Sequence, residues 1–494
     1  MSETGDPTGH SLTSAYAGLV IGVLLCVAML LSAPPEGMSL TAWRTASVGA
    51  LMAAWWVTEA IPIAATALLP IALFPLLGIA TVEATTAPYG NSVIYLFLGG
   101  FLIAMAIEGS GLHRRLALTI LDAVGTRPAN LILGFMVATA IISMWVSNAA
   151  TVVMMLPMAT SVIAIAKGNT AATSDTVVQR QRRAFDIALL LGVAYAASIG
   201  GLGTLIGTPP NALFAGFMSE TYGVKIGFVE WMVLGVPIVA IALPFAWLLL
   251  TRWMYPVGSD PLAGGAEMLH AERRALGPIS KAERLVAIIT GLTVTAWVTR
   301  PLIERWIPSV TDTGIAITGA LLLFVFPVAW HPRRVALTWK QAERLPWSVL
   351  VLFGGGLSLA AAIQKSGLAG WIGGELGGLA GWPVYGLILA VTTVVIFLTE
   401  LTSNTATAAA FLPVVASLAG GIGADPMLLA IPTTLAASCA FMLPVGTPPN
   451  AIVYGTGELT IPQMVRAGWW LNVFFVGLIP LVCYFFAARI FTTT

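Results

Sequence analysis

Charge is what this chain has least of. Only 9% of its residues are Asp, Glu, Lys or Arg, whereas soluble globular domains carry roughly 25%. Hydrophobic residues make up 58% of the chain, and apolar stretches long enough to cross a bilayer recur along it, as in 15–31, 234–250 and 471–488. The surface is therefore expected to face lipid, and no separate soluble domain is predicted.

Cysteine and histidine are also scarce. The three cysteines all lie in apolar stretches, and the four histidines are scattered. This pattern favours packing roles for the thiols over a disulfide or metal set. The net charge of +1 excludes a nucleic-acid footprint.

Basic residues indicate the orientation in the membrane. Residues 1–14 hold Glu3 and Asp6 but no Lys or Arg, unlike the basic start of a signal peptide, so a retained first helix is expected. Lys and Arg gather near Arg114, near Lys167, in 252–284 and in 333–344. Because cytoplasmic loops carry an excess of Lys and Arg, the sequence predicts a cytoplasmic N-terminus, about eleven crossings and an external C-terminus.

The stretch from Arg127 to Lys167 fits no ordinary crossing. It is uncharged inside, too long for one span and too short for two spans with a turn. Since both ends are basic, we predict a re-entrant hairpin over 128–166, with a half-helix up to Val146, a turn at Ser147-Asn148-Ala149 and a half-helix from Ala150. The alternative is one long tilted helix with a kink.

Self-similarity shows that the chain holds two copies of one unit. Residues 96–112 read LFLGGFLIAMAIEGSGL, and residues 352–368 read LFGGGLSLAAAIQKSGL. Ser147-Asn148 then matches Ser403-Asn404. Further on, both copies contain Gly-Thr-Pro-Pro-Asn-Ala, at 207–212 and 446–451.

An odd number of predicted crossings separates the copies, so they are inverted, as in many secondary transporters. The expected fold is all-α and polytopic, with about eleven transmembrane helices and two re-entrant hairpins in two inverted repeats. Four parts are predicted: tail and first helix 1–40, repeat 41–251 with hairpin 128–166, cytoplasmic linker 252–284, and repeat 285–494 with hairpin 380–420.

The polar motifs suggest ion chemistry at mid-membrane. Ser, Asn and Thr are preferred helix N-caps, so each hairpin tip directs the free N–H groups of a half-helix toward the bilayer centre, where an anion is favoured. Each Gly-Thr-Pro-Pro-Asn motif breaks a helix, and the unwound carbonyls and Asn side chains there offer uncharged oxygens of the kind that coordinate sodium. The alternative is that each motif is a structural Pro kink without a role in ion binding.

The positive charge that would neutralise a bound anion has to come from outside the four motifs, because none of them contains Lys or Arg. Bound cations are the simplest source, although Lys365 or a proton on Glu400 could contribute. Intramembrane carboxylates are functional candidates by default. For Glu59 and Glu108 a helix-end position is at least as well supported, and Glu400, three residues before Ser403, is expected to support the second tip.

With these motifs the chain resembles the divalent anion:sodium symporter family over nearly its whole length. The resemblance implies a homodimer that transports dicarboxylates, citrate or sulfate by an elevator-type movement. It implies one sodium site at Ser143, Ser147, Asn148 and Gly207, and another at Thr399, Thr402, Asn404 and Gly446. It implies that substrate is held by Asn148, Ser403, Asn404 and Thr405, with Thr208, Thr447 and Pro448 nearby.

One position departs from the family pattern: Ala149 stands where the first tip of the family has Thr. The expected function is sodium-coupled symport of a small divalent organic anion such as a C4-dicarboxylate at the inner (plasma) membrane. A sulfate or other anion symporter and a sodium-independent exchanger stay open. A membrane enzyme is disfavoured because no H-E-x-x-H or G-x-S-x-G motif occurs, and inverted repeats favour a carrier over a channel.

Overall fold

The computed structural model describes residues 12–170, 176–261, 264–331, 333–375, 378 and 381–487. Residues 1–11 of the predicted N-terminal tail, positions 262–263 of the linker and 488–494 of the second repeat lie outside these ranges. So does position 380, where the second hairpin is predicted to begin.

Helices form most of the described chain and strands only a few residues of it, which confirms the all-α class. Up to residue 254 the helices are α1 (Leu12–Leu31), α2 (Leu40–Thr58), α3 (Ile63–Thr66), α4 (Leu69–Leu76), α5 (Val82–Thr86), η1 (Ala87–Gly90), α6 (Ser92–Ser110), α7 (Leu112–Val124), α8 (Pro128–Ser143), α9 (Asn148–Thr170), α10 (Thr176–Gly201), α11 (Pro209–Tyr222), α12 (Phe228–Leu248) and η2 (Leu249–Met254).

The second half of the chain adds the remaining helices and one small antiparallel sheet. The elements are α13 (Gly265–Leu276), α14 (Lys281–Ile303), α15 (Asp312–Val325), β1 (Pro327–Trp330), β2 (Arg333–Val335), α16 (Trp339–Ala342), α17 (Trp347–Lys365), α18 (Leu368–Glu375), α19 (Val384–Thr399), α20 (Asn404–Gly421), α21 (Met427–Ala437), α22 (Pro448–Tyr454), α23 (Ile461–Val482) and η4 (Cys483–Ala487).

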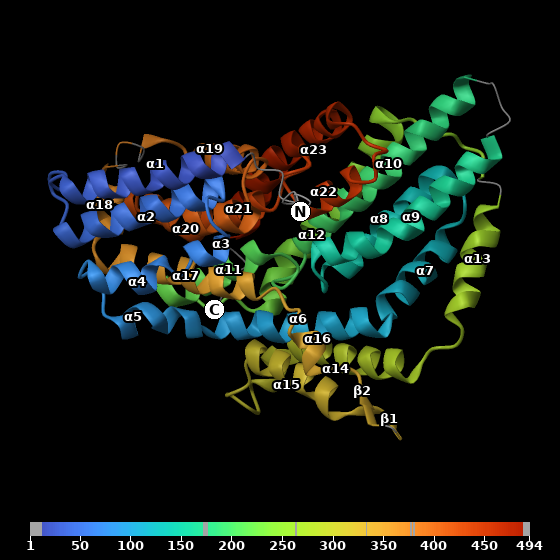
Figure 1. Cartoon of the computed structure of the whole chain (residues 1–494), viewed down its shortest axis with the longest axis horizontal. Coiled ribbons are helices and arrows are strands. Elements are labelled where there is room, and N and C mark those ends of the chain that lie inside the picture. The colour runs from blue at the N-terminus through green and yellow to red at the C-terminus, as the bar shows by residue number, and fades with distance from the viewer. Residues whose placement is uncertain are drawn as a thin grey trace, which may run out of the picture.

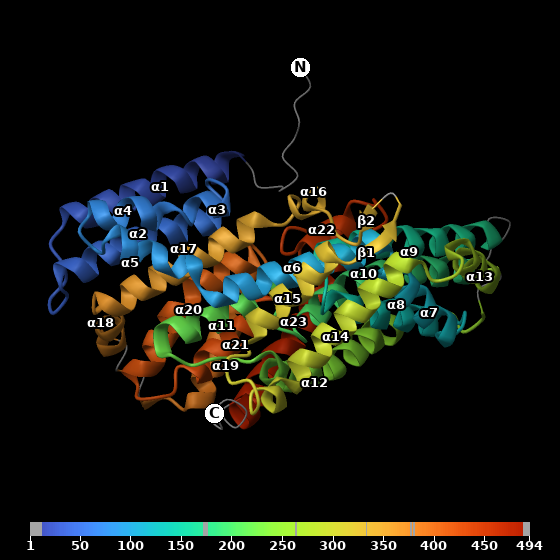
Figure 2. The same ribbon diagram turned by 90° about the horizontal axis from the view of Figure 1, so that it is seen from below.

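Seven helices in the described ranges are long and apolar enough to cross a membrane, and six shorter apolar helices accompany them. The chain is a multi-pass membrane protein. The two helix pairs α8–α9 and α19–α20 lie in opposite halves of the molecule in both views (Figures 1 and 2).

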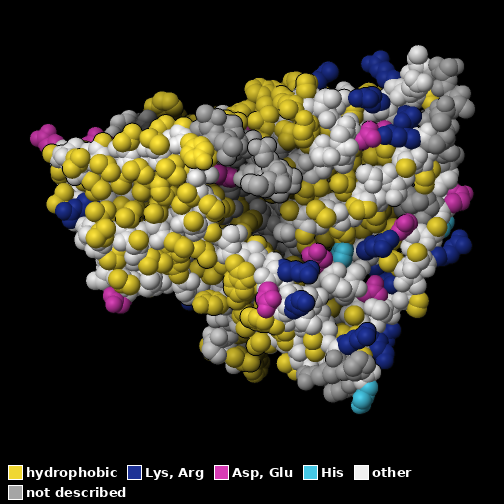
Figure 3. Space-filling model, in the orientation of Figure 1, with side chains coloured by type: hydrophobic (Ala, Val, Ile, Leu, Met, Phe, Trp, Pro, Cys, Tyr) yellow, Lys and Arg dark blue, Asp and Glu magenta, His cyan; other side chains and the backbone are white. Residues whose placement is uncertain are grey.

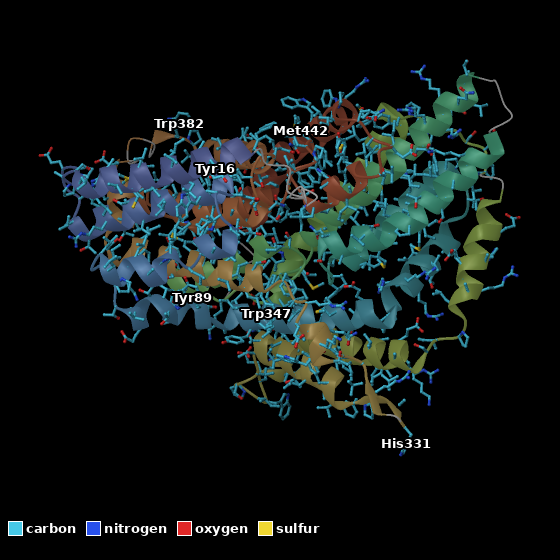
Figure 4. The ribbon with its side chains drawn as sticks, in the orientation of Figure 1. Tyr16, Tyr89, His331, Trp347, Trp382 and Met442 are labelled. Carbon is cyan, nitrogen blue, oxygen red and sulfur yellow. The ribbon has the colours of Figure 1, made fainter. Side chains whose placement is uncertain are left out.

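Close contact between small residues packs the helices, as is common between membrane helices. A Cβ added at Gly200 of α10 would lie 2.4 Å from the Ala140 carbonyl oxygen of α8. Between α18 and α20, Gly373 and Gly421 meet in the same way. The Tyr89 side chain (labelled in Figure 4) packs over Gly354 of α17, where a side chain would displace its ring.

Charged residues lie mostly at one end. On the face shown in Figure 3, most Lys and Arg side chains gather toward the end where α9, α10 and α13 lie. There Arg114 of α7 pairs with Glu272 of α13 at 2.5 Å. Glu59 follows the last residue of α2 with a φ of 47°, and Glu108 is exposed near the end of α6, so both carboxylates lie at helix ends.

Candidate functional site

The first tip joins α8 to α9 near the middle of the molecule (Figure 1). The turn occupies residues 144–147, so the predicted turn at 147–149 is displaced: Asn148 already opens α9. Ser147 explains the shift, because its hydroxyl accepts a hydrogen bond from the Ala150 amide at 3.4 Å and thereby caps the helix.

The second tip repeats this arrangement from the other end. Helix α19 ends at Thr399, and α20 begins at Asn404 with Ser403 as its N-cap residue. In both pairs the free N–H groups that open the second helix lie at the tip, where helices favour negative charge.

Oxygen atoms converge beside the first tip. The Ser143 hydroxyl lies 2.7 Å from the Asn148 side-chain oxygen and donates to the Ala197 carbonyl at 2.8 Å. With its amide turned over, Asn148 donates to the carbonyls of Gly207 and Ala197, both at 3.2 Å. We call Ser143, Asn148, Ala197 and Gly207 the first oxygen cluster.

The second copy builds an equivalent group. The Thr399 hydroxyl lies 2.8 Å from the Asn404 side-chain oxygen and donates to the Ala437 carbonyl at 2.9 Å. We call Thr399, Asn404 and Ala437 the second oxygen cluster. Thr399 holds the place of Ser143, and Ala437 that of Ala197. The two inverted copies therefore present the same polar geometry.

The asparagine of each Pro-Pro-Asn motif donates hydrogen bonds to main-chain carbonyls at a helix break. Asn211 donates from its amide nitrogen to the carbonyls of Gly201 at 3.2 Å and Thr204 at 2.8 Å. Asn450 does the same, at 3.3 and 3.0 Å, for the carbonyls of Ala440 and Leu443. The side-chain oxygens of both asparagines are buried without a partner. An unpartnered buried oxygen is costly, and a bound cation could satisfy it.

Hydrogen bonds join tips and breaks. Thr204, within the first break, donates to the Met144 carbonyl in the first turn at 2.5 Å. The hydroxyls of Thr208 and Ser438 lie 3.4 Å apart. Thr208 directly precedes α11, and Ser438 directly follows α21. The two repeats therefore touch at their breaks.

Glu400 organises the second break. It follows α19 and is buried, and its two carboxylate oxygens accept from the backbone N–H groups of Phe441, Met442 and Leu443 at 2.7–3.1 Å. Asn472 of α23 adds a fourth donor at 2.7 Å. Met442 is labelled in Figure 4. The sequence predicts support of the second tip, whereas the hydrogen bonds of Glu400 join the start of that tip to the second break and to α23.

The remaining predicted residues lie around these clusters. A Cβ at Gly446 would lie 3.2 Å from a Glu400 carboxylate oxygen. Thr447 caps α22 by accepting from the Asn450 amide at 3.3 Å, and Pro448 is the first residue of that helix. Thr405 is buried in the first turn of α20. The Thr402 hydroxyl instead bonds within its hairpin, to Thr407.

Sequence reasoning missed Ala197 and Ala437. Asn211 and Asn450 belong to the repeated Pro-Pro-Asn motifs, whose side-chain oxygens the sequence marks as suited to sodium, but they were assigned to neither site. The two alanines act through main-chain carbonyls, and no sequence signal marks a carbonyl.

Known proteins resemble this chain over nearly its whole length. The family model for the sodium:sulfate symporter transmembrane region matches residues 13–491. The sodium-dependent dicarboxylate transporter SdcS of Staphylococcus saprophyticus is 42% identical over 472 residues, covering 95% of this chain and 90% of the relative. The transporter of the same name in Staphylococcus aureus is 43% identical over 473 residues, with the same two shares.

Solved structures resemble the fold at low sequence identity. The Alcanivorax borkumensis YdaH transporter aligns with a TM-score of 0.53 and 14% identity, covering 98% of each chain. Neisseria gonorrhoeae MtrF aligns with a TM-score of 0.55 and 11% identity, covering 98% of this chain and 96% of that one. The family match and the identity to the staphylococcal relatives are much stronger, and they show that this chain belongs to the divalent anion:sodium symporter family, whose members are transporters and not enzymes.

Proposed function

We propose that the protein is a sodium-coupled symporter of a small divalent organic anion such as a C4-dicarboxylate. The observation that carries the proposal is the duplicated oxygen cluster beside two inverted helix tips. Uncharged oxygens are typical sodium ligands at broken helices. The staphylococcal relatives, named as sodium-dependent dicarboxylate transporters, support the same cargo.

The residues fit a cation, which enters here as cargo. In the first site, Ser143, Ser147, Asn148 and Gly207 would hold sodium. In the second, Thr399, Thr402, Asn404 and Gly446 would do so. The amide of Asn148 lies among acceptors that favour its nitrogen; sodium would favour its oxygen instead.

The substrate anion would lie between the tips. Asn148, Ser403, Asn404 and Thr405 would contact it, with Thr208, Thr447 and Pro448 nearby. None of these side chains is cationic, and helix termini supply only partial positive charge. Sodium at both sites would complete the neutralisation, which links substrate binding to sodium binding.

The alanine at position 149 favours a second candidate function, in which the protein is a symporter of sulfate or another anion. Thr405 at the second tip carries a hydroxyl, whereas Ala149 at the first tip does not. The two ends of an extended dicarboxylate would then be held unequally, while a compact anion needs fewer donors. A sodium-independent exchanger is the remaining alternative.

Exchanging the tip residues separates these substrates. A hydrogen bond to a charged group contributes roughly 1.5–3 kcal/mol, part of which is offset by fitting a larger side chain. For a dicarboxylate, Ala149→Thr should therefore tighten binding about tenfold, and Thr405→Ala should weaken it at least as much. Apparent affinities for succinate and sulfate test this. If neither variant changes any affinity, the tips are not part of the substrate site.

The proposed orientation places the N-terminus and both ends of α8–α9 in the cytoplasm, and the C-terminus and both ends of α19–α20 outside. Single cysteines in place of Asn130 and Lys167 should react only from the cytoplasmic side. A cysteine in place of exposed Trp382 should react only from outside. Labelling of the first two positions from opposite sides would refute the re-entrant hairpin.

The wider mechanism is also proposed. Repeats 41–251 and 285–494, with hairpins 128–166 and 380–420, would supply a substrate-carrying unit that moves as an elevator within a homodimer. The linker 252–284 would stay cytoplasmic, next to the charged end in Figure 3.

Uptake into proteoliposomes decides between the candidates. Labelled succinate and labelled sulfate are offered with a sodium gradient, with equal sodium on both sides, and with potassium in its place. We expect saturable succinate uptake only under the sodium gradient. Equal uptake in potassium would contradict sodium coupling, and preferred uptake of sulfate would establish the second candidate.

A further inference from the structure

Three aromatic rings form a stack beside the first tip. Trp145 lies in the turn, Phe228 is the first residue of α12, and Trp297 lies in α14. The rings of Phe228 and Trp297 are 4.2 Å apart and 11° from parallel. Trp145 stacks on both, at 6.0 Å from Phe228 and 6.5 Å from Trp297.

Asp312 fixes two of these rings. One of its carboxylate oxygens accepts from the Phe228 backbone amide at 3.0 Å, and its carbonyl accepts from the Trp297 indole at 3.0 Å. Arg300 faces the other carboxylate oxygen at 3.4 Å. Phe228 and Trp297 are both almost fully buried. The turn therefore rests through Trp145 on a surface that is itself held in place.

Among the described residues, no such stack is present at the second tip. Leu401 occupies the position that corresponds to Trp145, and it is 58% exposed. Trp145 is only partly exposed. The two oxygen clusters match, but the first tip has an aromatic contact to α14 that Leu401 cannot provide at the second.

We propose that the Trp145–Phe228–Trp297 stack is a positioning device that sets the affinity of the first sodium site. The inference rests on the proposed function. Trp145 is two residues from Ser147 and three from Asn148, so the orientation of its ring fixes the backbone that presents both. Trp297 acts only through this ring. Stacked pairs of this kind shift an equilibrium constant roughly twofold to tenfold.

The first measurement follows the tip itself without sodium. The three natural cysteines are buried, so a thiol introduced by Ala149→Cys reports on the first tip. We expect Trp145→Ala and Trp297→Leu each to raise its labelling rate severalfold. Trp145→Phe, which keeps a ring, and Leu401→Ala at the second tip should leave the rate near that of the parent.

The second measurement is sodium binding in variants without the added thiol, read as the rise in melting temperature of the purified protein with sodium. Trp145→Ala and Trp297→Leu should each raise the half-saturating sodium concentration about threefold to tenfold. The double variant should resemble the single ones, because both remove the same contact. Phe228→Leu, which keeps much of the volume, provides a milder version if Trp297→Leu does not fold.

Each outcome of these measurements either supports or overturns the proposed role of the stack. Unchanged labelling in the variants of Trp145 and Trp297 overturns the proposal, and so does faster labelling with unchanged sodium dependence. Additive effects would show two independent roles and would also overturn it. If the parent protein shows no stabilisation by sodium, the proposed function fails, while labelling still decides whether the stack holds the tip.

Discussion

Sodium-dependent uptake should be abolished, or its half-saturating sodium concentration raised roughly 10- to 100-fold, by Asn148→Ala or by Asn404→Ala. Asn148 reaches Ser143, Ala197 and Gly207 in the first oxygen cluster, and Asn404 accepts from the Thr399 hydroxyl in the second. Alanine would remove the proposed cation ligand and leave these neighbouring groups without their amide partner.

The matched control is Asn130→Ala. Asn130 lies in the same helix pair but is exposed, and among the described residues its side chain makes one long bond, of 3.5 Å, to the Val124 carbonyl. Uptake and melting temperature should be close to those of the parent. Sodium titrations of all three variants in proteoliposomes provide the measurement. An unchanged sodium dependence in both Asn148→Ala and Asn404→Ala would refute the two-site assignment.

Much of this arrangement could be predicted because polar residues are rare in the chain. In an apolar segment, buried polar groups need partners, so a repeated Ser-Asn or Thr-Pro-Pro-Asn stands out. The same scarcity indicated the inverted copies and both helix pairs. The homologous contacts of Ser143 and Thr399 follow directly from this duplication.

Contacts made by main-chain atoms or by distant aromatic residues could not be predicted. Ala197 and Ala437 contribute carbonyls, and their side chains carry no information about that role. Trp145 stacks on Trp297, which belongs to a helix far along the chain, and apolar helices contain many aromatic residues. Only the packing of the helices selects which of these rings meet.

The position of the first turn was wrong by a few residues for a local reason. The Val146 amide still donates to the Ile142 carbonyl at 2.9 Å, so hydrogen bonds of helical type continue past the end of α8. Asn148 then starts α9 at once. The sequence shows the polar tip, but a Ser-Asn pair can lie in a turn or open a helix.

Removal of the Glu400 carboxylate should have the largest effect on stability. Three backbone N–H groups and the Asn472 amide donate to it. Each of its two oxygens accepts at least two of these hydrogen bonds. Phe441 and Asn472 are fully buried, so water cannot easily replace the missing acceptor. In the first copy, Met144 occupies the position that corresponds to Glu400. There the backbone N–H groups at the helix end donate to carbonyls of the same helix.

We expect Glu400→Ala to lower the free energy of unfolding by about 3 kcal/mol or more, since each stranded buried donor costs roughly 1–3 kcal/mol. The stability of Glu400→Gln should lie between that of the parent protein and that of Glu400→Ala, because one oxygen remains but an amide nitrogen now faces N–H donors. Thermal unfolding of the purified proteins in one detergent gives the ranking. Because the freed segment leads into Gly446 and Thr447, the surviving folded protein should also bind sodium more weakly.

Glu458→Ala is the control for this change. Glu458 pairs with Lys167, but its side chain is 37% exposed, and a pair of this kind contributes about 0–1 kcal/mol. The same truncation should therefore cost far less there than at Glu400. Equal losses at the two positions would show that the four donors at Glu400 find other acceptors. In that case the second break is held by Asn450, whose amide bonds to Ala440 and Leu443 flank the same segment.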